Sequence, residues 1–379
     1  MNLPGRETPV ARALQPTWHP VWGQSVRTRV RTRWPDSCKG QDAGNDQGNC
    51  VRYLITGGAG FIGSHLVEHL VATGHDVTVL DDLSSGRRAN LAAVRRDIRF
   101  IRGSVTDLNT CRRAVEHVDC VLHHAAVTSV QRSVDEPLVT HQVNATGTLN
   151  VLFAALEKGV HRVVYAGSTS AYGNPATLPN SEEHVTRPLS PYAASKLAGE
   201  EYCVAFHATY GLETVVLRYF NIFGPRQDPN SQYAAVVPRF IATALAGERP
   251  TIFGDGGQTR DFVYIANVVH ANLLAAGAPA AGVAGQVFNV GCGKGVSVNQ
   301  LWDHVRTLAG VPLAPLYTEG RAGEVRDSVA ALAKARRLVG YEPVVDFEEG
   351  LRQTVAFYRA QRAEQPRKRA RPRAVGAAA

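Results

Sequence analysis

A glycine-rich turn between an apolar strand and an apolar helix is the feature that most constrains this chain. The run VRYLITGGAGFIG places glycines at every third position from residue 57. Glycine there permits a left-handed turn, a close approach of the backbone to a diphosphate, and tight packing of helix on strand. The free N–H groups at the helix start favour an anion. The pattern predicts a dinucleotide site. The residues expected to hold the dinucleotide are Gly57, Gly60, Phe61, Ile62 and Gly63.

An acidic pair at the end of the next expected strand strengthens this interpretation. Asp81 and Asp82 follow the expected strand at residues 77–80. They stand about twenty residues after the glycine turn, where a carboxylate can accept a hydrogen bond from a ribose 2′-hydroxyl. Two carboxylates would also repel a 2′-phosphate. We therefore expect NAD as the cofactor, with NADP as the alternative that Arg87 and Arg88 leave open.

Strand-like and helix-like segments alternate from residue 51 to residue 220. The expected strands are Arg52–Ile55, Val77–Leu80, Ile98–Ile101, Cys120–His123, Val163–Ala166 and Thr214–Leu217. The expected helices are Phe61–Ala72, Leu108–Glu116, Val139–Glu157 and Tyr192–Thr209. This alternation predicts an α/β fold, a Rossmann-type doubly wound parallel sheet with right-handed crossovers.

The pattern changes after residue 220, where loops rich in glycine and proline separate scattered helices. The helices expected there are Val237–Ala246, Ile265–Ala276, Val298–Leu308 and Phe347–Arg359. We assign residues 51–220 to an NAD-binding domain. Residues 221–359 are mostly a smaller C-terminal substrate-binding domain at the carboxyl ends of the strands, with some segments returning to the first domain.

The two ends of the chain differ from the part between them. Residues 1–50 carry seven Lys or Arg and four Asp or Glu, and residues 359–379 carry seven against one. The remainder holds 27 basic and 28 acidic residues, so the net charge of +8 comes from the ends. Without any apolar period, residues 1–50 are expected to be disordered, or to precede a true start at Val51, and residues 360–379 to be a basic disordered tail. Aspartates and scarce serines argue against a transit peptide.

The composition also bears on partners and compartment. The six cysteines form no CxxC pair and no zinc-type spacing with histidine, and we expect no signal peptide before them. We expect reduced thiols, no metal and a cytoplasmic enzyme. No apolar run reaches the roughly eighteen residues of a transmembrane helix. The basic stretches are short and poor in apolar residues, so we expect neither a nucleic-acid nor a membrane partner.

Tyr192 and Lys196 form the second constellation, within SPYAASKLAGE. Residues four apart share one face of a helix, and an ammonium near a phenol lowers the phenol's pKa, which is near 10 unperturbed. Such a tyrosine can take a hydroxyl proton while a hydride leaves the same carbon. Ser168, just after a strand, could hydrogen-bond that hydroxyl. A chance pair on a surface helix and an ordinary turn serine are the alternatives, and the glycine turn upstream favours catalysis.

The chain resembles the extended short-chain dehydrogenase/reductases of the NAD-dependent epimerase/dehydratase family. It is most similar to the branch of UDP-glucose and UDP-N-acetylglucosamine 4-epimerases. The resemblance runs from about Val51 to Arg359. The motifs that carry it are TGGAGFIGSHLV, VLDDLSSG, VLHHAAVTSVQRSVDEP, NATGTLNVL, YAGSTSAYG, PYAASK, LRYFNIFGPRQDPNSQYAAVVPRFI, FGDGGQTRDFVYI and FNVGCGKGVSVNQL.

The resemblance implies an isomerase of nucleotide-sugar metabolism. Tyr192 would accept the proton of the sugar 4-hydroxyl, and the C4 hydride would move to NAD and return to the other face of a 4-keto sugar. Lys196 would also position the nicotinamide ribose. A homodimer is implied as well, paired through the expected helices 139–157 and 192–209.

Site residues follow from the resemblance position by position. The implied catalytic residues are Ser168, Tyr192 and Lys196. Tyr192 and Lys196 also contact the cofactor, together with Val105, Ala125, Ala126, Asn144, Tyr219 and Phe220. The implied substrate-binding residues are Thr128, Ser168, Thr169, Asn221, Val236, Arg260, Arg321, Glu324 and Ser328. For Arg260 the alternative is a solvated loop charge, although a cation in a glycine-rich loop suits a diphosphate.

The chain departs from the family's pattern at several positions. Ser104 and Val105 follow the third strand where many relatives carry an acid that contacts adenine, so that contact is in doubt. Glu324 stands where aspartate is usual near the uridine ribose. Ser328 matches a tyrosine that restricts some members to unacetylated hexoses, so an N-acetyl group should fit. The alternative is that Ser328 caps a helix starting near Val329.

The alternatives are other enzymes that act on sugar nucleotides and a protein without catalytic activity. A 4,6-dehydratase or decarboxylase is the nearest alternative, but the related dehydratases carry Asp-Glu where this chain has Ser170-Ala171. Without that acid, elimination of water lacks its proton donor. A net oxidoreductase would release reduced cofactor. A non-catalytic NAD-binding sensor or scaffold would not need the serine, tyrosine and lysine, all of which are present.

Overall fold

The computed structural model describes residues 50–229, 235–320 and 325–364. The expected extension 1–50 and tail 360–379 lie outside these residues, apart from Cys50 and the last turn of a helix. Arg321 and Glu324, two candidates for substrate binding, also lie outside them. Within the described ranges, no helix is both long and apolar enough to span a membrane.

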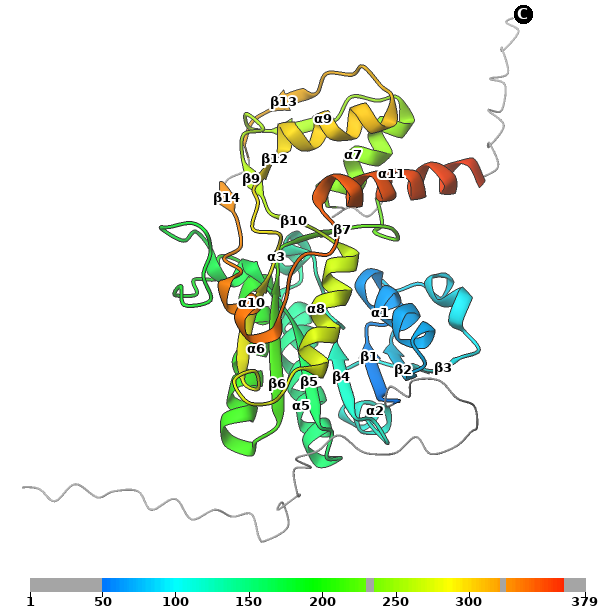
Figure 1. The fold of residues 1–379 in the computed structure, drawn as a ribbon, viewed down its shortest axis with the longest axis vertical. Coiled ribbons are helices and arrows are strands. Elements are labelled where there is room, and N and C mark those ends of the chain that lie inside the picture. The colour runs from blue at the N-terminus through cyan, green and yellow to red at the C-terminus, as the bar shows by residue number, and fades with distance from the viewer. Residues whose placement is uncertain (1–49, 230–234, 321–324, 365–379) are drawn as a thin grey trace, which may run out of the picture.

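Seven parallel strands form the central sheet of the described residues (Figure 1). They are β1 (Arg52–Thr56), β2 (Asp76–Asp81), β3 (Ile98–Arg102), β4 (Cys120–His123), β5 (Arg162–Ser168), β6 (Glu213–Tyr219) and β11 (Gln286–Val290). Their spatial order is β11-β6-β5-β4-β1-β2-β3. The six expected strands are confirmed, with ends within two residues, and β11 is an addition from the second half of the chain. The order reverses at β1, beside β4, the point at which such sheets bind ligands.

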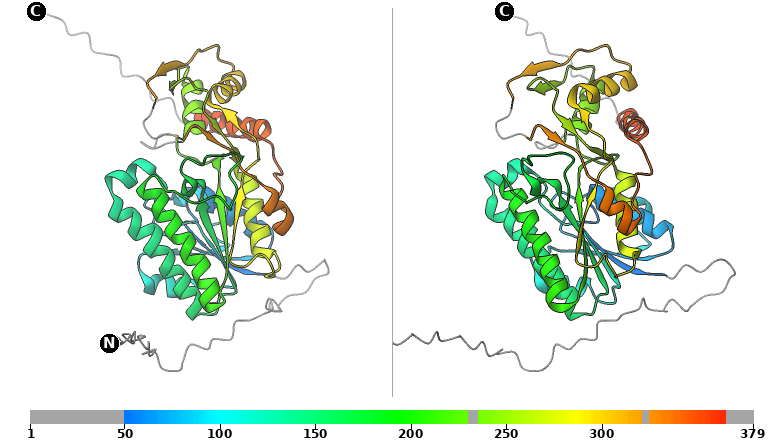
Figure 2. Two further views of the ribbon diagram at one scale, coloured as in Figure 1. Left: turned by 90° about the vertical axis from the view of Figure 1, so that its left-hand side faces the viewer. Right: turned by 60° about the vertical axis from the view of Figure 1, so that its left-hand side comes forward.

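Helices cover both faces of the sheet, and the strands are buried accordingly. One face carries α2 (Leu108–Ala114), α5 (Gly147–Glu157) and α6 (Pro191–Tyr210); the other carries α1 (Phe61–Ala72) and α8 (Ile265–Gly277) (Figure 2). Leu54 of β1 packs toward the first set, whereas Tyr53 and Ile55 pack toward the second. Apolar residues on both faces are typical of doubly wound parallel sheets, so the expected fold class is confirmed.

The expected helix Val139–Glu157 is present, but it contains a π turn that was not predicted. A short helix α3 (Val130–Asp135) is followed by α4 (Pro137–His141), a π turn at Gln142–Thr146, and then α5. The π turn brings Asn144 against the backbone of Val127, an interaction that helical periodicity alone does not predict.

The remaining elements form a smaller unit at the end of the sheet where β6 leads into β7 (Figure 1). Its elements are β7 (Asn221–Phe223), α7 (Val236–Ala246), β8 (Thr251–Phe253), β9 (Thr259–Arg260), β10 (Phe262–Tyr264), β12 (Val296–Ser297), α9 (Val298–Ala309), β13 (Leu316–Thr318), β14 (Asp327–Ser328) and α11 (Phe347–Glu364). Between them the chain returns to the sheet through α8 and β11, and α10 (Ala333–Val339) packs on β11.

Candidate active site

The glycine turn has the geometry of an anion cradle. Gly57 adopts φ +68°, and its N–H donates to Leu80 O at 2.8 Å. A Cβ on Gly63 would lie 2.2 Å from the Gly57 carbonyl oxygen, so no larger residue fits without a shift. Helix α1 begins after Gly60 without a side-chain cap. Its first N–H groups are therefore left for a ligand, as a dinucleotide diphosphate requires.

Asp81 braces this turn from β2. Its Oδ2 accepts from the Ala59 N–H at 2.9 Å, and its Oδ1 accepts from the Leu83 N–H at 2.8 Å. Burial raises the pKa of Asp81, and these two hydrogen bonds oppose the rise. Each carboxylate oxygen keeps a second lone pair for a ligand hydroxyl. Asp82 is exposed at the same strand end.

Arg87 and Arg88, which made NADP an alternative cofactor, interact with other residues of the protein. Arg87 forms an ion pair with Asp228. The Arg88 guanidinium lies over the Phe100 ring, with its carbon 4.6 Å from the ring centre. Their engagement favours NAD, which carries no 2′-phosphate to attract them.

The loop after β4 is held by side chains from two elements, β1 and the π turn. Thr56 Oγ1 accepts from the Ala125 N–H at 3.1 Å. Asn144 Oδ1 accepts from the Val127 N–H at 2.8 Å, and its Nδ2 donates to Val127 O at 3.0 Å and to Ser195 Oγ at 2.9 Å. Asn144 is thus a brace between this loop and α6. Ala126 lies partly buried within the loop, and Val105 is buried beside α5.

Sequence reasoning missed the partner of Tyr219. The Tyr219 hydroxyl accepts from Asn272 Nδ2 at 2.8 Å and lies 3.1 Å from His124 Nε2. Burial lowers the pKa of His124 to about 4, so the ring is neutral, and its Nε2 shares a hydrogen bond with the phenol. The Tyr219 hydroxyl therefore faces the protein interior, and Phe220 beside it is buried. His124 was missed because it belongs to no catalytic spacing.

Ser168 and Tyr192 come together at the carboxyl end of the sheet. Ser168 ends β5, and Ser190 caps the start of α6 by accepting from the Ala193 N–H at 3.1 Å. Tyr192 therefore lies in the first turn of α6. A side-chain hydrogen bond to Ser168 lowers the Tyr192 pKa, although burial raises it by more. Ser168 Oγ also lies 2.8 Å from Ser170 Oγ.

Lys196 lies one turn further along α6 and is buried. Its ammonium is 4.3 Å from the centre of the Tyr165 ring. Burial lowers the pKa of Lys196 to about 7. The prediction that Lys196 lowers the Tyr192 pKa is wrong in this structure, because burial of the phenol outweighs other influences and the ammonium is directed at another ring.

The described candidate substrate residues come from the segments after β4 and β5 and from four elements of the smaller unit. Arg260 Nη1 donates to Thr259 O at 2.8 Å and to Arg326 O at 3.0 Å. Ser328 is the register partner of Arg260 in the pairing of β14 with β9. The remaining described candidates are Thr128 after β4, Thr169 after β5, Asn221 at the start of β7, and Val236 at the start of α7.

Ser328 does not cap a helix. It lies in β14, and the next helix, α10, begins only at Ala333. That alternative is wrong because β14 pairs with β9, which keeps the chain extended through Ser328. Asp261, which the sequence analysis did not assign, holds this arrangement. Its fully buried carboxylate accepts from the N–H groups of Cys292 at 2.7 Å, Gly293 at 2.8 Å and Ala330 at 3.1 Å.

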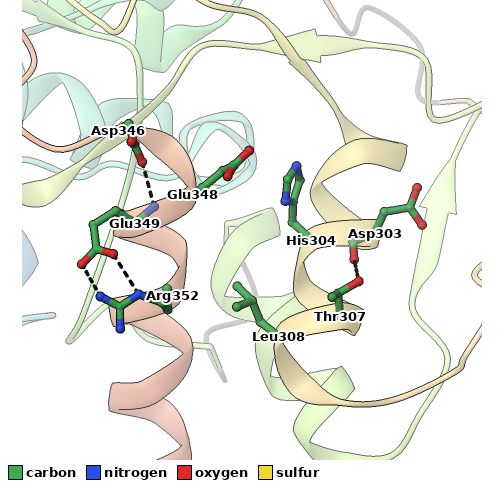
Figure 3. Close-up of a pocket in the computed structure, with 8 residues that line it drawn as sticks. All are labelled: Asp303, His304, Thr307, Leu308, Asp346, Glu348, Glu349 and Arg352. Atoms are coloured by element: carbon green, nitrogen blue, oxygen red, sulfur yellow. Dashed lines mark hydrogen bonds and ion pairs between the residues drawn. The ribbon is translucent and has the colours of Figure 1, made fainter.

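A cavity of about 570 Å³ lies apart from these residues, between α9 and α11 (Figure 3). Its lining residues are Asp303, His304, Thr307, Leu308, Asp346, Glu348, Glu349 and Arg352, none of which was predicted from the sequence. Its charges are partly paired, since Glu349 Oε2 accepts from Arg352 Nε at 2.8 Å. Across the described ranges, no cluster of three or more His, Cys, Asp or Glu side chains is placed to hold a metal ion.

Comparison with known proteins now identifies the family. Residues 53–291, more than half of the chain, match the NAD dependent epimerase/dehydratase family. The chain belongs to this family. The resemblance inferred from the motifs is thereby confirmed, and Ser168, Tyr192, Lys196 and the glycine turn all lie within the matched segment.

Individual relatives are similar over most of the chain. The UDP-glucose 4-epimerase of Mycolicibacterium smegmatis is 41% identical over 313 residues, which is 82% of this chain and 99% of that protein. A crystal structure of UDP-glucose 4-epimerase with UDP-glucose from Thermotoga maritima is 40% identical, with a TM-score of 0.78, and covers 82% of this chain and 99% of its own. The UDP-N-acetylglucosamine 4-epimerase of Methanobrevibacter ruminantium, in complex with UDP-N-acetylmuramic acid, is 37% identical with a TM-score of 0.78, covering 83% and 100%.

Proposed function

We propose that this protein is an NAD-dependent isomerase that inverts C4 of a UDP-hexose through a 4-keto sugar. UDP-glucose and UDP-galactose, or the N-acetylated pair, are the proposed substrates. The observation that carries the proposal is the meeting of Ser168 with Tyr192 at the carboxyl end of the sheet, with Lys196 one helical turn away. Relatives named as 4-epimerases over nearly their whole length support it.

The proton chemistry falls to Tyr192 and Ser168. Tyr192 is partly exposed at the start of α6, so its oxygen can reach a sugar. After losing its own proton, the phenolate accepts the proton of the sugar 4-hydroxyl and later returns it. The Ser168 hydroxyl, held by Ser170, can hydrogen-bond the same sugar oxygen. Lys196, with a pKa of about 7, can exchange a proton with its surroundings at neutral pH.

NAD fits the residues present. Gly57 and Gly63 have no room for a side chain, so only glycine keeps the backbone in this turn. The first turn of α1 offers uncapped N–H groups to the diphosphate. The carboxylates of Asp81 and Asp82 lie at the end of β2, where an adenine ribose would be held. When bound, NAD supplies the hydride acceptor and donor that make oxidation at C4 reversible.

For the sugar nucleotide we propose a diphosphate site at Arg260 and Asn221. Arg321 and Glu324 are proposed partners of the nucleotide, Thr128 and Thr169 of the sugar, and Val236 of the pocket wall. Ser328, buried beside Arg260 in register, is the proposed gate for an N-acetyl group. A serine excludes less volume than a tyrosine, so acetylated hexoses should be accepted.

The chain carries less support for a dehydratase. At the position of the dehydratase Asp-Glu pair, the Ser170 hydroxyl is engaged by Ser168, and Ala171 is buried. Neither side chain can act as the acid that eliminates water. A non-catalytic dinucleotide-binding protein is also disfavoured, because the serine, tyrosine and lysine are all present and lie together.

We further propose a homodimer. The two segments expected at the interface, 139–157 and 192–209, carry exposed large side chains. Val139 is 44% exposed, Phe153 40% and Tyr202 39%. Pairing of these faces would remove their apolar surface from water. Light scattering should give twice the mass of the chain, and a single-chain mass would contradict the proposal.

We also propose that the protein works in the cytoplasm. Four of the described cysteines, Cys111, Cys120, Cys203 and Cys292, are free thiols. Free buried thiols are typical of a reducing compartment.

A substrate panel tests the proposed function. The purified protein would be incubated with UDP-glucose, UDP-N-acetylglucosamine, UDP-glucuronic acid or GDP-mannose, and the products separated by chromatography. We expect the C4 epimer of one or both of the first two sugars. A 4-keto-6-deoxy product would instead indicate a dehydratase, and no product from any sugar would contradict enzyme activity of this class.

A further inference from the structure

Buried arginine–carboxylate pairs bracket the neighbouring strands β5 and β6. At the amino end of the strands, Arg162 Nε donates to Glu213 Oε2 at 3.0 Å. At the carboxyl end, Arg218 Nε donates to Glu200 Oε2 at 3.0 Å, and Nη2 completes a bidentate contact with Oε1. All four residues are less than one tenth exposed. The pair at the carboxyl end is the one beside the proposed catalytic residues.

Glu200 belongs to the helix that carries the proposed base. Tyr192, Lys196 and Glu200 are spaced four residues apart on α6, so they follow one another along one face of the helix. Arg218 therefore anchors, through Glu200, the same face of α6 that presents Tyr192.

Arg218 also contacts the turn that follows Ser168. Its guanidinium carbon lies 4.6 Å from the centre of the Tyr172 ring, and Tyr172 closes the 3₁₀ turn at Thr169–Tyr172. The Tyr172 hydroxyl donates to Asn289 Oδ1 at 2.7 Å, which fixes the ring against β11. One guanidinium thus lies between the helix of Tyr192 and the turn of Ser168.

We infer that Glu200 and Arg218 are positioning residues for the reaction, holding α6 and the Ser168 turn at the separation at which the serine hydroxyl reaches the Tyr192 phenol. This inference rests on the proposed function. Neither residue touches the reacting atoms. Their effect is geometric, because a misplacement of a reacting group by about 1 Å can cost about a hundredfold in rate.

The first test compares Glu200→Gln with Glu213→Gln. Each change removes the charge from a buried carboxylate that pairs with a buried arginine, so both variants should lose thermal stability. Glu200→Gln should lower kcat by about tenfold to a hundredfold while KM for the UDP-sugar stays within about twofold. Glu213→Gln should leave kcat within about twofold of wild type. Equal loss of kcat in the two variants would overturn the inference.

The second test separates position from stability. In the double variant Glu200→Leu with Arg218→Met, apolar side chains replace the whole pair, a change that buried ion pairs often tolerate without loss of stability. We expect a folded protein whose kcat remains low. A stable double variant with the kcat of wild type would overturn the inference.

Amide hydrogen exchange gives a measurement that does not depend on the substrate. Glu200→Gln should accelerate exchange in residues 168–173 and at the start of α6, whereas Glu213→Gln should not. Unchanged exchange there would overturn the positioning role. If exchange changes as expected but the wild type converts no UDP-sugar, the proposed function fails and the positioning of the turn stands.

Discussion

Arg260 and Ser328 are register partners on the parallel strands β9 and β14. The Asp261 N–H donates to Ser328 O at 2.8 Å, and the Asp261 carboxylate accepts from the Ala330 N–H. The residue proposed for the diphosphate and the residue proposed for the acetyl gate are therefore fixed to one another. A substrate held at Arg260 would present its sugar at a constant distance from Ser328.

Replacing Ser328 with tyrosine should narrow the sugar pocket. Because Ser328 is 9% exposed, a phenol there would occupy the space that an acetamido group needs. We expect Ser328→Tyr to lower kcat/KM for UDP-N-acetylglucosamine by at least about tenfold and to change that for UDP-glucose little. Ser328→Ala, which adds no volume, is the matched control. Equal losses on both sugars, or a wild type inactive on the acetylated sugar, would refute the gate.

Loss of the Tyr192 hydroxyl should abolish turnover without loss of the cofactor. Tyr192→Phe removes only the group that accepts the proton, a contribution worth about 10²–10⁴ in rate. NAD bound to the purified variant would be measured after denaturation, and turnover by chromatography. Tyr317→Phe, which alters an exposed phenol in the smaller unit, is the control. If Tyr192→Phe keeps turnover within about tenfold of wild type, another group is the base.

Burial of Lys196 should make the free energy of unfolding depend on pH. Its pKa is lowered to about 7 in the folded protein, so between pH 7 and 10 the unfolded chain binds more protons, and this residue makes stability rise with pH. Lys196→Met removes that slope. The free energy of unfolding of the variant relative to wild type should fall by about 2 kcal/mol from pH 6.5 to pH 9.

Urea unfolding of protein freed of dinucleotide would measure this difference. Lys158→Met, which removes an exposed ammonium 3.6 Å from Glu116, should show a difference that varies little with pH. If the free energy of unfolding of Lys196→Met relative to wild type is constant or rises with pH, then burial of the ammonium does not destabilise the protein as proposed.

A methyl group on Gly63 should disrupt the dinucleotide cradle. Its Cβ would lie 2.2 Å from the Gly57 carbonyl oxygen, and relief of that clash costs about 1–3 kcal/mol. We expect Gly63→Ala to lower the melting temperature and to weaken NAD binding in calorimetric titration. Gly277→Ala, at the end of α8 with no atom within 4 Å of the new Cβ, should do neither. Wild-type affinity for NAD in Gly63→Ala would contradict the cradle.

The strands, the glycine turn and helix α6 could be predicted from the sequence, because each depends on residues close together in the chain. The strands and the glycine turn are apparent because apolar runs and glycines are consecutive in the chain. Helix α6 was expected at Tyr192 and begins at Pro191, since Ser190 and Pro191 form a recognisable start. The family was apparent from the motifs, and the match of residues 53–291 confirms it.

Features that depend on contacts between distant segments were not predictable. The strand β11 joins the sheet from the second half of the chain, and the extended state of Ser328 depends on pairing with β9. The direction of the Tyr192 pKa shift was wrongly predicted, because burial of the phenol raises the pKa and burial cannot be seen in the local spacing of residues. Asp261 and Glu200 were missed for the same reason, since their partners are remote in sequence.

The fate of the hydrogen on C4 tests the central claim most directly. UDP-glucose carrying deuterium at C4 would be incubated with the protein, and the product examined by NMR and mass spectrometry while absorbance at 340 nm is followed. Because the hydride leaves and returns to the same carbon, we predict UDP-galactose that retains the deuterium at C4, with no rise in absorbance beyond one equivalent of enzyme. Loss of the deuterium to solvent, or continued accumulation of reduced cofactor, would contradict C4 epimerisation by this protein.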